Sequence, residues 1–93
     1  MSVRCKFKVD STTQHATSVA LYDETGKHTG YKPGTMHTIR LTPVYGNGDP
    51  NHENTKFWQA SPSGSIVFGW INEEAAKQLV IGKEYYIDIT AAE

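Results

Sequence analysis

The sequence predicts a small, mainly β fold: an antiparallel barrel or sandwich of about six strands, with one short helix before the last strand. Three observations lead to this prediction. Residues 3–10 alternate strictly between apolar and polar side chains, the period of a half-buried strand. Several short apolar segments are separated by turns rich in Gly, Pro, Asn and Asp, as in small antiparallel proteins. Asn72, followed by Glu73 and Glu74, is a typical helix start, and it precedes the final alternating segment.

The expected elements follow in chain order. Two stretches of turn residues, 23–27 and 29–34, predict one long hairpin loop with Lys27, His28, Tyr31 and Lys32 at its tip. Residues 46–55 predict a flexible surface loop. The helix is expected over Asn72–Leu79. The six strands are expected over residues 3–10, 17–22, 36–45, 57–60, 65–70 and 84–90.

Length and charge limit the functions that can be expected. The 93 residues predict a single β-rich domain over 1–93, with a small core. A net charge of −1 creates no overall field that attracts nucleic acid or a membrane. The charge is uneven, because residues 1–40 hold six of the nine Lys and Arg residues and only three of the ten acids. One cysteine, no apolar signal region and no apolar membrane span predict a protein of the cytoplasm.

Three phrases in the second half of the chain resemble a known pattern. Residues 53–58 read ENTKFW, residues 61–66 read SPSGSI, and residues 82–88 read GKEYYID. Together they resemble an uncharacterised family of short proteins from tailed bacteriophages and prophages, with the pattern ENxxF…PSGxI…GKEYY[VI]D. The segment Ser11–Gly34 departs from the pattern, which predicts an insertion. The resemblance implies a viral origin and a host-cytoplasm setting, and it implies no catalytic residue.

No group of residues indicates catalysis, a metal or a cofactor. Cys5 lies on the apolar face of the first expected strand, which predicts a buried structural thiol. Gly46 and Gly48 do not match a phosphate-binding loop. The four histidines do not have the spacing of zinc ligands; they are His15, His28, His37 and His52. The sequence therefore predicts a non-enzymatic protein without a cofactor.

Binding of single-stranded nucleic acid is the function that the sequence favours by a small margin. Such proteins combine a basic groove with aromatic side chains that stack on bases. The candidate residues are Arg4, Lys6, Lys8, Lys27, Tyr31, Lys32, Arg40 and Trp58, with Trp70 as an alternative stacking residue. The competing interpretation is that Lys and Arg point outward on any strand while Trp fills the core. The near-neutral charge also argues against strong binding.

Protein–protein interaction is the alternative. A host-protein inhibitor, active in counter-defence, would use Tyr, Trp and Arg as anchors and the loops 27–34 and 46–55 as contact regions. A minor structural protein of the virion is a further possibility. Pro43 cannot donate a hydrogen bond in a strand, so an open edge is expected at Val44–Tyr45, where a homodimer could form. No membrane partner is expected.

Overall fold

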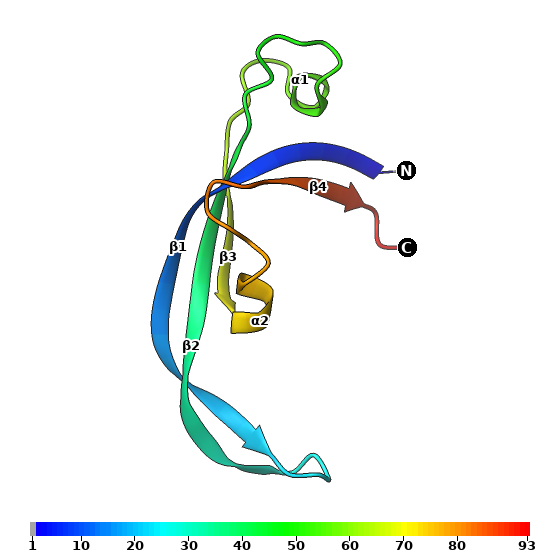
Figure 1. Ribbon diagram of the computed structural model, residues 1–93. Coiled ribbons are helices and arrows are strands. Elements are labelled where there is room, and N and C mark those ends of the chain that lie inside the picture. Colours follow the sequence, from blue (N-terminus) through cyan, green and yellow to red (C-terminus); the bar gives the residue numbers. More distant parts are fainter. Residues whose placement is uncertain (1) are drawn as a thin grey trace.

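The computed structural model describes residues 2–93 and shows one open antiparallel sheet with two short helices (Figure 1). The elements are β1 (Ser2–Tyr22), β2 (His28–Pro43), α1 (Glu53–Phe57), β3 (Ile66–Ile71), α2 (Glu73–Ala76) and β4 (Glu84–Thr90). The strand order across the sheet is β3-β2-β1-β4, and all neighbouring strands are antiparallel. The prediction of a mainly β fold is therefore confirmed.

The sheet does not close into a barrel, and it has four strands in place of the predicted six. β3 and β4 lie at opposite ends of the strand order and are not paired with each other. The predicted strands 3–10 and 17–22 form one continuous strand, because residues 11–16 contain no Gly or Pro that would interrupt an extended chain. The predicted strand 57–60 is absent, since Phe57 ends α1 and residues 58–60 form a loop.

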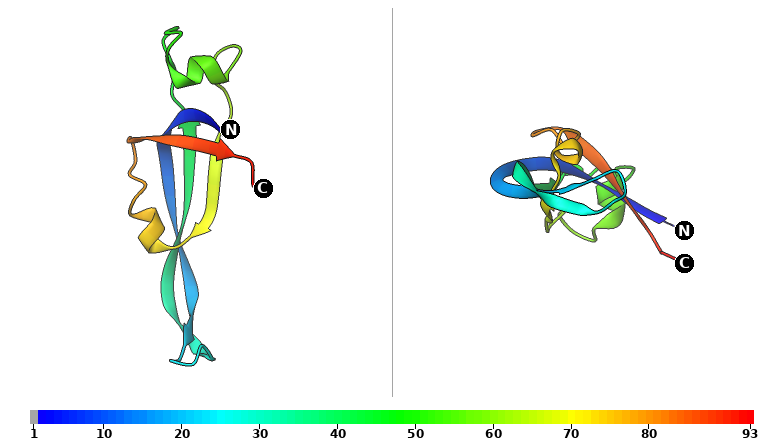
Figure 2. Two further views of the ribbon diagram at one scale, coloured as in Figure 1. Left: turned by 90° about the vertical axis from the view of Figure 1, so that its right-hand side faces the viewer. Right: turned by 90° about the horizontal axis from the view of Figure 1, so that it is seen from below.

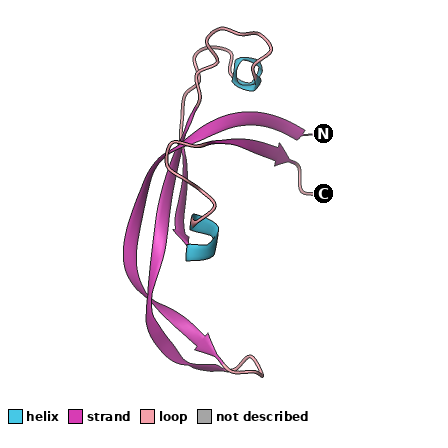
Figure 3. Ribbon diagram, in the orientation of Figure 1, coloured by secondary structure: helices cyan, strands magenta, loops and turns pink. Residues whose placement is uncertain are grey.

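The molecule is elongated. Its dimensions are 54 × 32 × 17 Å and its radius of gyration is 17.6 Å, whereas a compact domain of this length has a radius of gyration of about 12 Å. The cause is the β1–β2 hairpin, whose far half extends beyond β3 and β4 as a two-stranded ribbon (Figure 3). We call this ribbon, residues 15–36, the arm. It lies largely within Ser11–Gly34, the segment that departs from the phage-protein pattern.

The arm ends in a tight turn, so the long loop predicted over residues 23–34 is not present. Asp23 closes the turn by accepting hydrogen bonds from the backbone N–H groups of Thr25 at 2.9 Å and Lys27 at 3.0 Å. Residues 30–34 already belong to β2 and are paired with β1. Gly34 has a packing role there, because a Cβ atom at this position would collide with the Val19 side chain across the ribbon.

The core is small and lies on one face of the sheet. Among residues 2–93 its five buried apolar residues are Cys5, Phe7, Val9, Ile39 and Leu41. The partly buried residues around them are Trp58, Ile66, Ile71, Ala76, Leu79, Tyr85 and Ile87. The sheet is curved, and α2 covers its concave side, which is this core face (Figure 1, Figure 2). Within residues 2–93 no helix covers the opposite side, which we call the outer face.

A β-bulge at Asp10 shifts the alternation of side chains along β1. Val9 is paired with Leu41 before the bulge, and Thr12 is paired with Ile39 after it. Asp10 has no partner in this register. Across the bulge, β1 is therefore one residue longer than the part of β2 that it pairs with. Odd-numbered residues of β1 therefore face the core up to Val9, and even-numbered residues continue that face beyond the bulge.

The predicted start of α2 is confirmed. Asn72 is the N-cap, and its Oδ1 atom accepts a hydrogen bond from the N–H of Ala75 at 2.9 Å. The helix ends at Ala76, earlier than predicted, and the following turn places Leu79 against the core. The sequence did not predict α1, which lies partly within the expected loop 46–55. His52 is the N-cap of α1, and its Nδ1 atom accepts a hydrogen bond from the N–H of Asn54 at 3.1 Å.

Asn54 completes the sheet at the point where β2 leaves β1. Its Oδ1 atom accepts from the N–H of Lys6 at 2.6 Å, and its Nδ2 atom donates to the carbonyl oxygens of Lys6 at 2.7 Å and Val44 at 2.6 Å. The N–H of Val44 also donates to the Lys6 carbonyl, at 3.1 Å. The expectation of an open edge at Val44–Tyr45 is therefore wrong for Val44, whose backbone groups both have partners inside the chain.

Candidate interaction surfaces

The outer face brings together five of the predicted binding residues. The register places Arg4 opposite Asp88, Lys6 opposite Tyr86 and Lys8 opposite Glu84, and each pair shares the outer face. On β2, two more basic side chains belong to this face of the sheet; they are Arg40 and Lys32. Lys32 lies in the arm, where the ribbon twists away from the body (Figure 2).

Acidic neighbours neutralise much of this basic surface. Arg4 forms a two-point hydrogen-bonded ion pair with Asp88, at 2.6 and 3.1 Å. That hydrogen bond raises the pKa of Arg4 and lowers the pKa of the Asp88 carboxyl. The Arg4 guanidinium also lies 4.6 Å from the centre of the Tyr86 ring. Arg40 forms an ion pair with Asp10 at 2.5 Å. Two of the five basic side chains are therefore held by carboxylates.

Lys6 and Lys8 differ although they lie two residues apart on β1. The Lys6 ammonium is 3.9 Å from a Glu84 oxygen and 5.2 Å from the centre of the Tyr86 ring, and its side chain is only 22% exposed. Lys8 is exposed and forms no ion pair among the described residues. On the outer face of the body, Lys8 is thus the basic group most available to a ligand.

The remaining three predicted residues lie elsewhere. Lys27 is in the turn at the arm tip. Tyr31 belongs to the other face of the arm, where its ring contacts His28 at a centroid distance of 4.7 Å; His28 in turn contacts Tyr22 at 5.7 Å. Trp58 packs against the core, with its ring 5.9 Å from that of Phe7. The prediction that Trp58 stacks on a ligand is not supported by this position.

Trp70 is the exposed tryptophan of the outer face, and the sequence named it only as an alternative. Its side chain is 64% exposed and stacks on His15, with ring centres 5.5 Å apart. The His15 Nε2 atom is 3.0 Å from the hydroxyl of Thr38. Trp70 has a φ of 60°, a left-handed conformation, which creates a bulge opposite β2 and turns the ring toward His15. A signal for this bulge was present in the sequence, since Gly69 interrupts an otherwise apolar strand.

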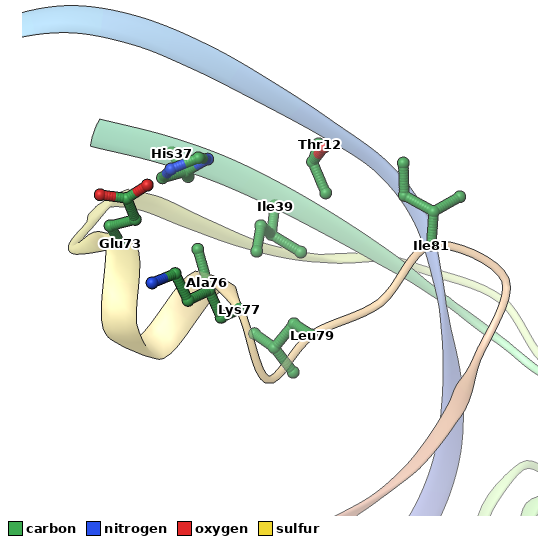
Figure 4. A pocket seen from close by; sticks show the side chains of 8 residues that line it. All are labelled: Thr12, His37, Ile39, Glu73, Ala76, Lys77, Leu79 and Ile81. Carbon is green, nitrogen blue, oxygen red and sulfur yellow. The ribbon is translucent and has the colours of Figure 1, made fainter. Parts of the chain in front are cut away.

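A pocket of about 200 Å³ lies on the core face between α2 and the sheet (Figure 4). His37 and Glu73 are at one end of the pocket, and Ile81 is at the other. The His37 Nε2 atom is buried without a hydrogen-bond partner among the described residues. The walls between the two ends are mostly apolar, with Ile39 and Leu79 among them. The imidazole of His37 and the carboxylate of Glu73 therefore share one end of an otherwise mostly apolar pocket, and no hydrogen bond or ion pair joins them within residues 2–93.

Cys5 is 2% exposed. Burial raises the pKa of its thiol, so the protonated and weakly nucleophilic form predominates at neutral pH. Residues 2–93 contain no group of three or more His, Cys, Asp or Glu side chains arranged to hold a metal ion. None of the helices in that range has the length and apolar character needed to cross a membrane.

Comparison of the chain with protein-family models, curated proteins and solved structures found no match. The resemblance to phage proteins stays a prediction from the sequence.

Proposed function

We propose that this protein is a non-enzymatic module that joins a protein assembly through its arm. The observation that carries the proposal is the arm itself: two strands that extend past β3 and β4, with no third strand from the described part of the chain beside them. An isolated two-stranded hairpin is marginally stable in water, and a further strand or packing against another surface is needed to stabilise it. A partner protein would provide that surface.

The side chains of the arm support a protein partner. Tyr22 and Tyr31 are 64% and 66% exposed, and Val19 and Leu21 are each more than one-third exposed. Exposed tyrosines and aliphatic side chains are frequent anchors of protein interfaces. The arm has two acids and two lysines over residues 15–36, so it carries no excess positive charge for nucleic acid. A host-protein inhibitor and a minor virion protein would both use such an arm, in a bacterial host cytoplasm or in a particle assembled there.

A shortened arm tests the proposal. Replacing Thr17–Gly34 by Asn-Gly joins Ala16 to Thr35, which are directly paired, and keeps the contacts of the body. When tagged chains are isolated from phage-infected bacteria, the wild type is expected to retain a protein in about stoichiometric amount, and the shortened variant to lose it. Hydrogen exchange should show unchanged protection of β4 in the shortened variant. If both chains retain the same proteins, the arm is not the binding element.

Single-stranded nucleic acid remains a second candidate, favoured by one observation: Arg4, Lys6, Lys8 and Arg40 lie on one uncovered face beside exposed Trp70. Bases could stack on this tryptophan, and phosphates would contact the basic side chains.

The nucleic-acid candidate is tested with Lys8→Glu plus Lys32→Glu, since neither lysine forms an ion pair in the described chain. If the outer face binds nucleic acid, this variant loses retention of a single-stranded oligonucleotide at about 50 mM salt. The control Lys77→Glu plus Lys83→Glu changes the net charge equally on the core side of the sheet, where Lys77 lines the pocket and Lys83 alternates with the outer-face Glu84, and this variant should keep the oligonucleotide. Absence of wild-type binding at this salt concentration excludes the candidate.

A further inference from the structure

Apart from the short edge of β1 at Ser2–Arg4, four stretches of strand edge are unpaired within residues 2–93, and three of them carry features that discourage pairing with another chain. The outer edge of β4 carries Glu84 and Asp88. The edge of β2 in the arm contains Lys32 and Pro33. β3 is short and is interrupted by the bulge at Trp70. Charges, proline and bulges are the usual means by which proteins protect exposed edges.

The fourth edge, along Ser11–Tyr22 of β1, has none of these features. These twelve residues include no Lys, Arg, Asp or Glu, and no Pro or Gly. The pairing with β4 ends at Lys8, and among the described residues Ser11–Tyr22 make no backbone hydrogen bond except to β2. The segment contains three Thr residues, one Val and one Tyr, residue types that favour strands. Without protection, such an edge readily accepts another strand.

We propose that this edge pairs with the same edge of a second copy of the chain, in antiparallel orientation. The inference rests on the proposed function, because it names the protein that the arm binds. A segment without charges can pair with itself without placing like charges opposite each other, which is the usual obstacle to self-pairing. The two arms would then form one four-stranded ribbon, with β2 of each copy on its outer sides. Two-fold symmetry closes this arrangement at a dimer.

The orientation follows from the position of the body. β4 and the chain before it lie on the same edge of β1 as the free segment, because Val9 is hydrogen-bonded to Gly82 and Lys83. Parallel pairing would bring the two β4 strands into collision. Antiparallel pairing places the two bodies at opposite ends of the joined arms. In an antiparallel pair with two-fold symmetry, one residue lies directly opposite the same residue of the other chain. We assign this central position to Thr17, at the middle of the segment, because cross-strand Thr pairs are favourable.

This register brings each arm tip to a complementary part of the other copy. With Thr17 opposite Thr17, Tyr22 lies opposite Thr12, and the turn beyond it reaches the segment before β4. That segment exposes Val80 (52%) and Ile81 (60%). It also carries Lys83, which forms no ion pair within the described residues. The tip supplies the Tyr22 ring for the apolar pair, and it carries Asp23 and Glu24, whose charge is opposite to that of Lys83.

Mass measurement in solution is the first step of the test. Light scattering after size exclusion is expected to give twice the chain mass of 10.3 kDa for the wild type. A mass of one chain at about 100 µM, where even a weak specific dimer is populated, overturns the inference. The proposed function would still stand in that case, provided that the shortened arm loses a different protein in the isolation experiment.

Charged substitutions at Thr17 then test whether the edge Ser11–Tyr22 forms the dimer interface. Thr17→Lys and Thr17→Asp each place like charges opposite each other in the dimer, so each variant alone is expected to raise the dimer dissociation constant several-fold. Mixing the two restores the dimer, because the charges are then opposite. This rescue shows that neither variant had simply unfolded. The control Thr35→Lys puts the same charge on β2 of the arm, away from the shared edge, and should remain dimeric. If both Thr17 variants dimerise as the wild type does, a different surface forms the dimer and the inference is wrong.

Discussion

Asn54→Ala is expected to lower the free energy of unfolding by about 3 kcal/mol, because it removes three hydrogen bonds to part-buried backbone groups and leaves two of these groups, the Lys6 N–H and the Val44 carbonyl, without a partner among residues 2–93. The Asn54 side chain is 0% exposed and bonds both backbone groups of Lys6 and the carbonyl of Val44. Alanine removes all three bonds. Chemical denaturation followed by tryptophan fluorescence measures the change.

Two comparison variants separate the hydrogen bonds from other effects of the Asn54 substitution. Asn54→Asp keeps the volume and the acceptor for the Lys6 N–H, but it cannot donate to the two carbonyls, so we expect a comparable loss of stability. Asn72→Ala removes an exposed helix cap and should cost about 1 kcal/mol. If Asn54→Ala costs no more than Asn72→Ala, the side chain of Asn54 does not complete the sheet in solution.

Ile39→Ala is expected to cost about 3 kcal/mol, since Ile39 is 0% exposed at the centre of the core and its removal leaves a cavity. Within residues 2–93 the core has only five buried apolar residues, so this loss is a large part of a stability that is small in any domain of this length. Thermal unfolding monitored by circular dichroism provides the measurement.

The matched control for the core is Val67→Ala, on the neighbouring strand but 58% exposed. Its effect should stay within about 0.5 kcal/mol. If the two substitutions lower the stability equally, the buried face of the sheet is not the face that carries Ile39.

The sequence predicted individual elements of the body better than the number of strands and the elongated shape. The alternation of residues 3–10 and the Asn72 cap are local signals, and both agree with the structure. The six-strand barrel was wrong because it relied on turn residues that do not turn the chain. Pro33 and Gly34 are residue types that favour a loop, yet they lie within β2. There the pairing with β1 and the space needed by the Val19 side chain decide the backbone conformation.

The candidate surface was predicted in part for the same reason. Alternation along β1 was enough to place Arg4, Lys6 and Lys8 on one face. The carboxylates that pair with Arg4 and Lys6 are those of Asp88 and Glu84, more than seventy residues later, and only the register of β4 brings them close. The role of Trp58 could not be read from its neighbours either, because its packing partner Phe7 lies on a distant strand.

The length of the arm can vary because the arm contributes no residue to the core and because β1 accommodates an extra residue at Asp10. Adding two residues to each strand of the arm would lengthen it by about 7 Å and keep every side chain on its present face. Adding a single residue to one strand would instead reverse the faces beyond that point, as Asp10 already does once. The body would not be affected by changes in steps of two. Related chains can therefore differ in arm length while sharing one body, and the distance between the two bodies of a dimer would change in the same steps.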